Sequence, residues 1–403
     1  MVTLQLKFKV QIMISFEDAL NIILTDVRPT GTERIGFNNA LFRVLAQDVF
    51  SDVDMPPFDK AAVDGFACRR ADLDSELELL EIIAAGQIPS KVVSKGKCIK
   101  VMTGAIVPQG ADTVIMVEHT QETRPGFLRF TATITSPNIA YKAEDVKSGD
   151  KVWGKGMQIL PQHVAIFASV GCVNPIVARQ PRVAILSTGD ELVEPDQIPG
   201  TAKIRNSNGF QLVAQVKAAH CISNYMGIIP DDEHATDQAI AKALAENDMV
   251  ILTGGVSMGD FDFVPKIMLK NNVEILFQKV AVKPGRPTVF GRTKSSYIFG
   301  LPGNPVSSFI NFEVFVKPLL YKMMGMDWKP LSFELPMGVD FHRKTADRVE
   351  FLPVNIEETG HVVPVRYHGS AHIHAVCFAN ALICIPKGIN EIKKGALVNV
   401  RPI

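Results

Sequence analysis

Residues 181–325 show the clearest pattern in the chain, because apolar runs of strand length alternate there with segments of helical periodicity. The runs that predict strands are 182–188, 222–229, 248–254, 274–282 and a short run at 295–300. The segments that predict helices are 209–220, 235–247, 263–271 and 305–324. Strands that alternate with helices in this way predict a doubly wound α/β domain with a mostly parallel sheet.

The loops that follow these strands form the predicted ligand-binding region, since open parallel sheets bind ligands beyond the carboxyl ends of their strands. They read GDELVEP, PDDEHA, GGVSMGDFD, KPGRP and LPGNPVSS, and we expect all five at one edge of the sheet. Beside glycines and helix N-termini they offer the charged residues Glu191, Asp231, Asp232, Asp260, Asp262, Lys283 and Arg286. This combination fits a phosphate-bearing ligand together with a divalent cation.

The glycine loop at 252–262, LTGGVSMGDFD, matches neither of two common phosphate-binding patterns. A dinucleotide-binding fingerprint needs GxGxxG, and a P-loop needs GxxxxGK followed by Ser or Thr. Taken alone, the loop is equally consistent with a tight structural turn. Its position at the ligand edge favours a ligand cradle. The same position favours oxyanion capture by Lys283 and Arg286 of KPGRP over simple solvation of two basic residues.

The flanking regions have different patterns. Residues 14–50 look helical, whereas 54–145 are rich in short strands broken by Pro and Gly. Residues 146–180 read as a turn followed by a helix at 161–171, so the strand-rich part is predicted to be an insertion within an N-terminal domain. After Pro330, short alternating runs predict an all-β module of barrel size.

Composition and charge narrow the classes of partner. Lys plus Arg and Asp plus Glu number 42 each, so no overall field attracts nucleic acid or an anionic membrane, and we expect neither as a partner. The six cysteines never form a CxxC pair and lie mostly in apolar segments, as is typical of a reducing compartment. With neither a signal-peptide pattern nor a membrane-length apolar run, the sequence predicts a cytoplasmic protein. Residues 1–12, before Met13, read as a tail without function.

Two further groups of polar residues have ordinary structural interpretations. His372 and His374 share one face of a predicted strand with His368 nearby, so a metal pair is one interpretation. Exposed or packed histidines are favoured, because no neighbouring cysteine or acidic residue completes a ligand set. Asp59 and Asp64 lie in a loop opened by proline and, from the sequence alone, are turn or cap aspartates.

Taken together, eight stretches resemble the MoeA family, the molybdopterin molybdenumtransferases that include the E domain of gephyrin. They are PPFDKAAVDGFA, MTGAIVPQGADTVIMVE, AEDVKSGD, STGDEL, GGVSMGDFD, VKPGRP, GLPGNPVSS and ANALICIP. Their order and spacing extend over nearly the whole chain from Met13. The resemblance implies a multidomain protein of α/β and β domains. The implied domains are an elongated N-terminal, dimer-forming domain (13–50 with 146–180), a β-rich insertion domain (51–145), a molybdopterin-binding α/β domain similar to MoaB and Mog (181–326) and a C-terminal β-barrel (327–403).

The resemblance also implies an activity. Members of the family insert molybdenum from molybdate into adenylylated molybdopterin and release AMP in a Mg²⁺-dependent step. It implies a homodimer whose active cleft lies between the α/β domain of one subunit and the insertion domain of the other. Transient contacts with the adenylyltransferase and with recipient molybdoenzymes are implied as well. Two alternatives stay open, which are adenylylation of molybdopterin from ATP and a non-catalytic cofactor carrier or scaffold.

Candidate site residues follow from the resemblance, position by position. The implied catalytic residues are Asp59, Thr103, Asp145, Glu191 and Asp262. Glu191 and Asp262 would organise the metal and the pyrophosphate. The implied substrate-binding residues are Gly254, Gly255, Ser257, Asp231, Lys283, Arg286, Pro302, Gly303, Asn304, Arg348 and Ser370. Within that set, Lys283 and Arg286 would bind molybdate or phosphate.

The chain departs from the family pattern at three points. Arg286 stands where lysine is common, which keeps the charge but changes the geometry. Only Lys142 precedes the Glu-Asp of AEDV, where several basic residues or a glycine are frequent, so anion attraction from that side should be weaker. His374 and Ala375 replace a serine pair in the C-terminal module, and a histidine there would carry a pH-dependent charge.

Overall fold

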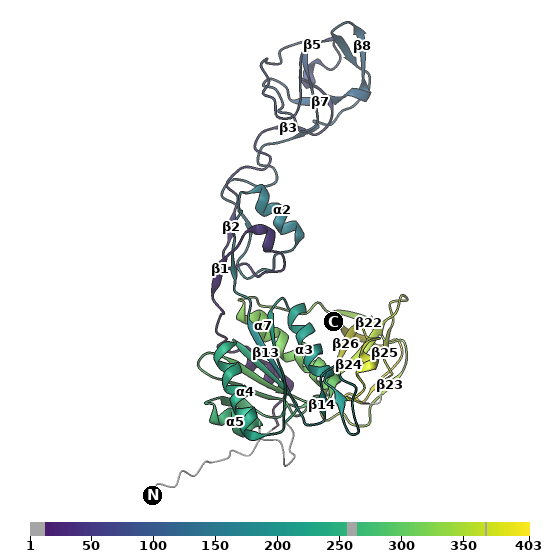
Figure 1. The fold of residues 1–403 in the computed structure, drawn as a ribbon. Helices are drawn as coiled ribbons and strands as arrows, with labels where there is room; N and C mark the ends of the chain where they lie inside the picture. Colours follow the sequence, from purple (N-terminus) through teal and green to yellow (C-terminus); the bar gives the residue numbers. More distant parts are fainter. Residues whose placement is uncertain (1–12, 256–263, 367–368) are drawn as a thin grey trace. The chain divides into compact units, whose positions relative to one another are not determined.

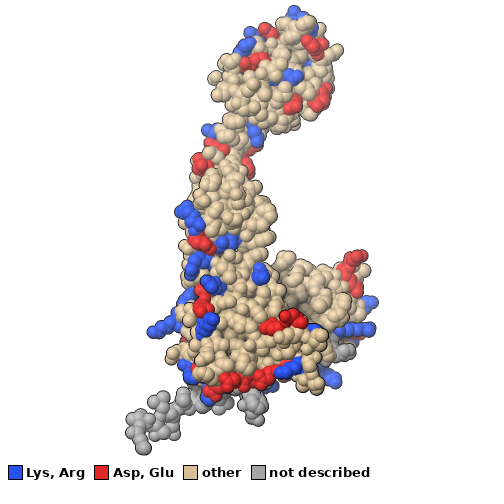
Figure 2. Space-filling view, viewed as in Figure 1, with Lys and Arg blue, Asp and Glu red and all other residues tan. Residues whose placement is uncertain are grey.

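The structure is a computed structural model that describes residues 13–255, 264–366 and 369–403. It contains two compact units (Figure 1). The first unit comprises the chain up to Arg34, Phe42–Ala46 and Ile176–Ile403, and the second comprises Ile35–Leu41 and Gln47–Pro175. Acidic and basic side chains both occur on the face drawn in Figure 2. No helix in the described ranges is long and apolar enough to cross a membrane.

A six-stranded sheet forms the centre of the first unit. Its strands lie in the order β16 (Ile222–Ile229), β13 (Arg182–Thr188), β17 (Met249–Thr253), β21 (Tyr297–Leu301), β20 (Val289–Arg292) and β18 (Glu274–Phe277). Neighbours among β16, β13, β17 and β21 are parallel, whereas β20 is antiparallel to both β21 and β18. The predicted doubly wound, mostly parallel sheet is confirmed.

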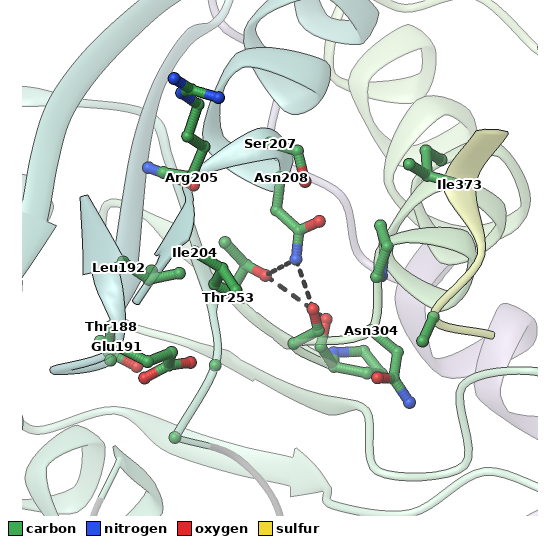
Figure 3. Close-up of a pocket in the computed structure, with 18 of the residues that line it drawn as sticks. Thr188, Glu191, Leu192, Ile204, Arg205, Ser207, Asn208, Thr253, Asn304 and Ile373 are labelled. Carbon is green, nitrogen blue, oxygen red and sulfur yellow. Dashed lines mark hydrogen bonds between the residues drawn. The ribbon is translucent and has the colours of Figure 1, made fainter. Parts of the chain in front are cut away.

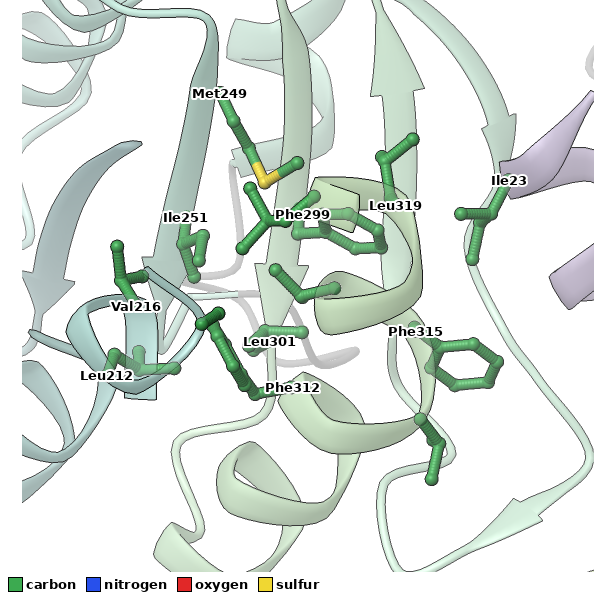
Figure 4. Close-up of a cluster of buried hydrophobic side chains, with 14 of the residues drawn as sticks. Ile23, Leu212, Val216, Met249, Ile251, Phe299, Leu301, Phe312, Phe315 and Leu319 are labelled. Atoms are coloured by element: carbon green, nitrogen blue, oxygen red, sulfur yellow. The ribbon is translucent and has the colours of Figure 1, made fainter. Parts of the chain in front are cut away.

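Helices cover both faces of this sheet, because alternate residues of each strand point to opposite sides. Ile185 and Ile251 face the cluster that includes α3, α6 and α7, part of which is drawn in Figure 4. Leu186 and Leu252 face the cluster that includes α4 and α5. A π-helical turn at Phe312–Val316 joins α6 to α7, so the helix predicted at 305–324 is continuous. The helices are α3 (Ser207–Ala218), α4 (Glu233–Glu246), α5 (Val264–Lys270), α6 (Pro305–Asn311) and α7 (Lys317–Met323).

The apolar run 274–282 serves two sheets, whereas the sequence predicts a single strand. β18 ends at Phe277, and β19 (Val282–Lys283) pairs in parallel with β24 (Val349–Ile356) of the C-terminal sheet. The chain changes sheets after the polar Gln-Lys pair that follows Phe277. The sequence pattern also misses β20, because its four residues begin one residue after KPGRP and read as an extension of that loop.

The C-terminal residues form a second sheet in the first unit, with the strand order β19-β24-β26-β28-β22 and with β25 beside β24. A bridge between Met337 and Val362 brings the end of β22 next to β25, so the sheet curls towards a barrel. The predicted all-β module is confirmed. Its further strands are β22 (Phe333–Pro336), β23 (Phe341–His342), β25 (Val362–Pro364), β26 (Ala381–Ile385), β27 (Glu391–Ile392) and β28 (Leu397–Pro402).

Two segments differ from the predicted secondary structure. Within residues 14–50 the one α-helix is α1 (Phe16–Leu24), and the chain beyond it is largely extended or turning. Gly31 there has a φ of +87°, which interrupts a helical pattern. The strand predicted around His372 and His374 is instead the short helix α8 (Ile373–Val376). The first unit also contains two short strand pairs. They are β1 (Thr32–Arg34) beside β12 (Ile176–Ala178), and β14 (Leu192–Val193) beside β15 (Ile204–Arg205). An isolated bridge joins Ile14 to Val280.

The second unit contains its own six-stranded sheet, in the order β7-β4-β6-β5-β9-β8, and the helix α2 (Pro161–Ser169). The strand-rich character predicted for 54–145 and the helix predicted at 161–171 are both present. The sheet strands are β4 (Gly65–Cys68), β5 (Leu77–Ile83), β6 (Lys97–Val101), β7 (Thr113–Met116), β8 (Thr120–Arg124) and β9 (Phe127–Phe130). Two short strand pairs accompany the sheet, β2 (Val49–Phe50) with β11 (Lys151–Trp153) and β3 (Lys60–Ala61) with β10 (Ile139–Ala140). Short 3₁₀ turns lie at Phe37–Asn39, Arg70–Asp72 and Val117–His119.

Candidate functional site

A pocket of about 660 Å³ opens at the carboxyl ends of the parallel strands in the first unit (Figure 3). It is lined by the residues that follow β13, β16, β17 and β21, as the topology predicts. Glu191 and Ile373 lie on opposite sides of it in Figure 3. The predicted site residues that line this pocket are Glu191, Asp231, Gly254, Gly255, Pro302, Gly303 and Asn304.

The first turn of α3 supplies residues that the sequence analysis missed. Asn206 caps this helix, because its Oδ1 accepts hydrogen bonds from the Gly209 amide at 3.0 Å and from the Ser187 hydroxyl at 3.1 Å. Asn208 donates from Nδ2 to Thr253 Oγ1 at 2.9 Å and to the Gly303 carbonyl at 2.7 Å (Figure 3). The sequence feature that could have predicted these residues is Asn206-Ser207-Asn208, which directly precedes the amphipathic segment and is a typical helix start.

The glycine pair of the predicted cradle is required by a close approach to the neighbouring strand. Gly254 and Gly255 have φ values of +97° and +63°, which L side chains rarely adopt. A Cβ on Gly254 would lie 2.5 Å from the carbonyl oxygen of Thr188. The backbone can therefore turn at the pocket only with glycine at this position. Ser257, Asp260 and Asp262 of the same loop lie outside the described residues.

Two buried oxygen atoms at the pocket have no hydrogen-bond partner among the described residues. They are Oγ1 of Thr188 and Oδ1 of Asn208, whose residues are 6 % and 9 % exposed. Because Asn208 Nδ2 donates to a backbone carbonyl, which can only accept, the orientation of this amide is fixed and its Oδ1 remains an acceptor. A ligand that offers hydrogen-bond donors would satisfy these oxygens.

Carboxylates lie at the rim formed by the loops after β13 and β16. The Asp231 amide donates to Asp190 Oδ1 at 3.1 Å, and the Asp190 amide donates to Asp231 Oδ2 at 3.3 Å, so each loop holds the other. Asp190 and Glu191 are exposed, Asp231 is half-buried, and Glu191 and Asp231 both line the pocket. Asp232, predicted in the same acidic set, instead caps α4 by accepting from the Ala235 amide at 2.7 Å.

This donor set fits a Mg²⁺ ion in its chemistry. Mg²⁺ prefers oxygen ligands and is usually held by one or two carboxylates together with water and substrate phosphates. Glu191 and Asp231 are two such carboxylates at one pocket. No group of three or more His, Cys, Asp or Glu residues that could enclose a metal occurs in the described part of the chain. The arrangement therefore suits an ion that arrives with its phosphate ligand.

Three predicted cationic residues lie on or beside the KPGRP loop, and we call them the cationic patch: Lys283 and Arg286 on the loop, and Arg348 next to Val282. KPGRP was expected beyond the same sheet edge as the other loops, but it follows β19 of the C-terminal sheet. The Arg348 guanidinium donates to the Val282 carbonyl at 3.4 Å, which places it next to Lys283 in the chain. Pro287, which directly follows Arg286, lines the pocket. The loop therefore leads from the cationic patch to the pocket.

The C-terminal module reaches the pocket through the segment at 370–373. Asn304 Nδ2 donates to Ser370 Oγ at 2.9 Å, and the Val306 amide donates to the Ser370 carbonyl at 3.0 Å. Ala371 and Ile373 line the pocket. Ser370 is therefore brought to the predicted substrate-binding residues of the α/β sheet.

The histidine segment follows directly. His374 packs edge-on against Phe378 with ring centroids 5.1 Å apart, and Ala375 is buried. In the described residues no metal group includes His372 or His374, and His368 lies outside the described ranges. The packed interpretation of His374 thus agrees with its ring contact.

The remaining predicted catalytic residues lie in the second unit. Asp59 accepts from the Lys142 amide at 2.7 Å, and the Asp145 amide donates to the Met55 carbonyl at 3.1 Å. Thr103 donates to Asp64 Oδ1 from its amide at 2.6 Å and from its hydroxyl at 2.7 Å. These two hydrogen bonds lower the pKa of Asp64. Asp64 thus acts as the turn aspartate that the sequence predicts.

Three sequence families match consecutive parts of the chain. "MoeA N-terminal region (domain I and II)" matches residues 14–171, "Probable molybdopterin binding domain" matches 184–322, and "MoeA C-terminal region (domain IV)" matches 334–403. Curated relatives from Staphylococcus epidermidis RP62A and Staphylococcus aureus Mu50, both named molybdopterin molybdenumtransferase, are 34 % identical over 96 % of this chain and 95 % of their own length. This chain belongs to the MoeA family.

A solved structure supports the same family at the level of the fold. It is the molybdopterin biosynthesis moeA protein from Pyrococcus horikoshii OT3, which is 31 % identical and superposes with a TM-score of 0.84 over 97 % of this chain and 100 % of its own. A second structure of the protein from that organism gives a TM-score of 0.80 at 28 % identity. The resemblance drawn from the eight sequence stretches is therefore confirmed.

Proposed function

We propose that this MoeA-family chain is a molybdopterin molybdenumtransferase that inserts molybdenum from molybdate into adenylylated molybdopterin and releases AMP in a Mg²⁺-dependent step. The curated relatives, which match almost the whole chain, carry the transferase name. The observation that carries the proposal is the pairing of two different sites in one unit. A pocket with two carboxylates is connected by the loop at 283–287 to a cationic patch.

Within this proposal the pocket binds the organic substrate. The start of α3 presents backbone amides that suit a phosphate group, while the unpartnered oxygens of Thr188 and Asn208 suit donors on a heterocycle. Glu191 would hold the Mg²⁺ together with Asp262, the second metal ligand that the resemblance implies, and Asp231 would support the ion as a further carboxylate of the pocket. Mg²⁺, when bound, supplies positive charge that offsets the charge developing on phosphate oxygens.

The cationic patch would bind molybdate beside that substrate. Lys283 provides an ammonium group and Arg348 a planar guanidinium, and Arg286 lies three residues further along the same loop as Lys283. Ser370, held by Asn304, offers a hydroxyl from the C-terminal module. Fixed donors of this kind orient a tetrahedral oxyanion without a reorganisation cost at the moment of reaction.

The second unit would complete the cleft in a homodimer. In this proposal Asp59, Thr103 and Asp145 come from the insertion domain of one subunit and face the pocket of the other. The loops that carry them are fixed locally, since Asp59 holds the Lys142 amide and Asp64 holds Thr103. The division into domains at 13–50 with 146–180, 51–145, 181–326 and 327–403 belongs to the same proposal.

The test supplies purified protein with adenylylated molybdopterin, Mg²⁺ and molybdate, and follows AMP release and activation of a molybdenum-free apoenzyme. We expect AMP only when molybdate and the metal are both present, together with an active apoenzyme. Binding of an adenylate that stays intact would instead support the carrier, and consumption of ATP with pyrophosphate release would support the adenylyltransferase.

Variants sharpen the same experiment. Glu191→Ala and Asp59→Ala should abolish cofactor synthesis while ligand binding and the overall fold persist, because both carboxylates are exposed and Asp59→Ala removes only the exposed hydrogen bond from the Lys142 amide. Asp262→Asn should slow adenylate cleavage more than it weakens molybdopterin binding. Equal losses of rate and affinity in Asp262→Asn would remove it from the metal site.

A further inference from the structure

A buried carboxylate lies directly behind the cationic patch. The side chain of Glu350 is 3 % exposed, and its two oxygens contact two different cations. Oε1 lies 2.9 Å from Nζ of Lys283, and Oε2 lies 3.2 Å from Nη1 of Arg343. The strand register explains the first contact, since Glu350 is the direct partner of Lys283 in the parallel pair of β19 and β24. Glu350 is not among the residues that line the pocket.

The two cations that contact Glu350 are in different situations. Arg343 is tied to the fold, because its guanidinium donates to the carbonyls of Ile389 at 2.6 Å, Pro386 at 2.6 Å and Arg348 at 3.1 Å. The Lys283 side chain is 39 % exposed and can meet a ligand. Glu350 therefore divides its charge between a structural cation and a cation of the patch.

The other two members of the cationic patch differ in their surroundings. Arg286 is exposed on the same loop, and Arg348 carries a partner of its own, since its Nε lies 3.4 Å from Asp347. The Asp347 side chain is 63 % exposed and is screened by water. Glu350 is thus the one fully buried negative charge among the ion pairs that the structure gives for the patch.

We propose that Glu350 is a positioning residue that sets the strength of the oxyanion site. Its carboxylate holds the Lys283 ammonium and competes with a bound oxyanion for that charge, so that molybdate is held loosely enough to pass on to the reaction. The inference rests on the proposed function of the cationic patch. Its physical basis is that charges act strongly on one another when they are buried and poorly screened.

The side-chain chemistry defines two informative variants. Glu350→Gln has almost the same shape but no charge, and it offers one acceptor where the carboxylate offers two. Glu350→Asp keeps the charge but shortens the side chain by one methylene. The proposal requires that the charge decides oxyanion affinity, so the two variants should behave differently.

The experiment measures the binding of inorganic molybdate, and separately of sulfate, to the full-length protein by titration calorimetry. We expect Glu350→Gln to bind both oxyanions about ten-fold more tightly than the unaltered chain. Glu350→Asp should stay within about three-fold, and the exposed control Glu334→Gln on β22 should leave binding unchanged. Damage to the fold would weaken binding, so a tightening separates the proposal from a purely structural role. Unchanged or weaker binding by folded Glu350→Gln would overturn it.

Two further variants keep the test decisive. In a Lys283→Met background, Glu350→Gln should no longer tighten binding, because Glu350 acts through Lys283; a persisting ten-fold gain would contradict this. If Glu350→Gln alone does not fold, Arg343→Met with Glu350→Gln removes both members of the buried pair, and the oxyanions should still bind more tightly. Weaker or equal binding by this double variant would refute the proposal.

A separate AMP-release assay distinguishes this inference from the proposed function. With Glu350→Gln, half-maximal AMP release should need about ten-fold less molybdate, while the maximal rate should not rise, since uniform tightening of substrate binding does not speed the chemical step. Absence of AMP release by the unaltered chain would reject the proposed function, yet the calorimetric comparison would still decide the role of Glu350.

Discussion

The pocket and the cationic patch of the first unit show how two sites in one fold acquire opposite properties. The pocket lies beyond parallel strands, and hydrogen bonds among Asn208, Thr253 and Gly303 fix its neutral floor. The cationic patch lies where β19 leaves the central region and joins the C-terminal sheet, and ion pairs hold it. Under the proposed function, the pocket would select a shaped organic ligand and the patch would select charge.

The largest effect is expected from Lys283→Met. Loss of the Lys283 ammonium should weaken molybdate binding about 100-fold, because Lys283 is the exposed cation paired with the buried Glu350. Binding of the adenylylated pterin should change less than three-fold. Calorimetry with each ligand measures the two effects. Lys294→Met, at an exposed turn elsewhere in the unit, is the matched control. Equal losses for the two ligands would break the distinction between the sites.

Asn208→Ala should have the reverse selectivity and a smaller effect. The variant removes the amide that joins α3 to Thr253 and Gly303, so the pocket loses a fixed acceptor and part of its floor. We expect about ten-fold weaker binding of the adenylylated pterin, in line with one lost hydrogen bond, and molybdate affinity within two-fold. Weaker binding of molybdate by the same factor would show that the two sites act as one.

A pH-dependent effect is expected in the second unit. The hydrogen bonds from Thr103 lower the folded-state pKa of Asp64 below its ordinary 3.8, so the stabilisation is present above that value and is lost as the pH falls through the lowered pKa. Thr103→Val removes the hydroxyl donor and should raise the pKa of Asp64. Carbon-13 NMR titration of the Asp64 carboxyl measures both values. A lower pKa in Thr103→Val would be inconsistent with this account.

The smallest effect is expected from removal of residues 1–12. The sequence predicts a tail without function, so AMP release and the unfolding temperature should both remain within error of the full-length chain. A large loss of either would show that this segment contributes to the fold, and the comparison of the two sites would then have to include it.

The pocket could be predicted from sequence because it follows from topology. Apolar runs of the right length identify β13, β16, β17 and β21, and parallel strands bring their following loops to one edge. The start of α3 was within reach, since Asn206 is a typical cap residue, but the periodic pattern begins only after it. The positions of Glu191, Asp231 and Asn304 at one pocket thus follow largely from secondary structure.

The cationic patch could not be predicted in the same way. The run 274–282 is mainly apolar, and the Gln278-Lys279 pair interrupts it too briefly for periodicity to show that the run is divided between two sheets. The contact between Lys283 and Glu350 joins residues far apart in the chain and depends on the register of β19 against β24. The sequence shows a glutamate at position 350 within an apolar run, but neither its burial nor its partner.

The most direct test of the central claim is the location of a heavy oxyanion in crystals of this protein. Crystals soaked with tungstate, a tetrahedral analogue of molybdate, give an anomalous diffraction signal that places the metal atom without reference to activity. The account predicts one strong peak within about 5 Å of Lys283 Nζ and the Arg348 guanidinium. A peak at the floor beside Asn208 and Thr253, with none at the cationic patch, would contradict the assignment of organic ligand to the pocket and oxyanion to the patch.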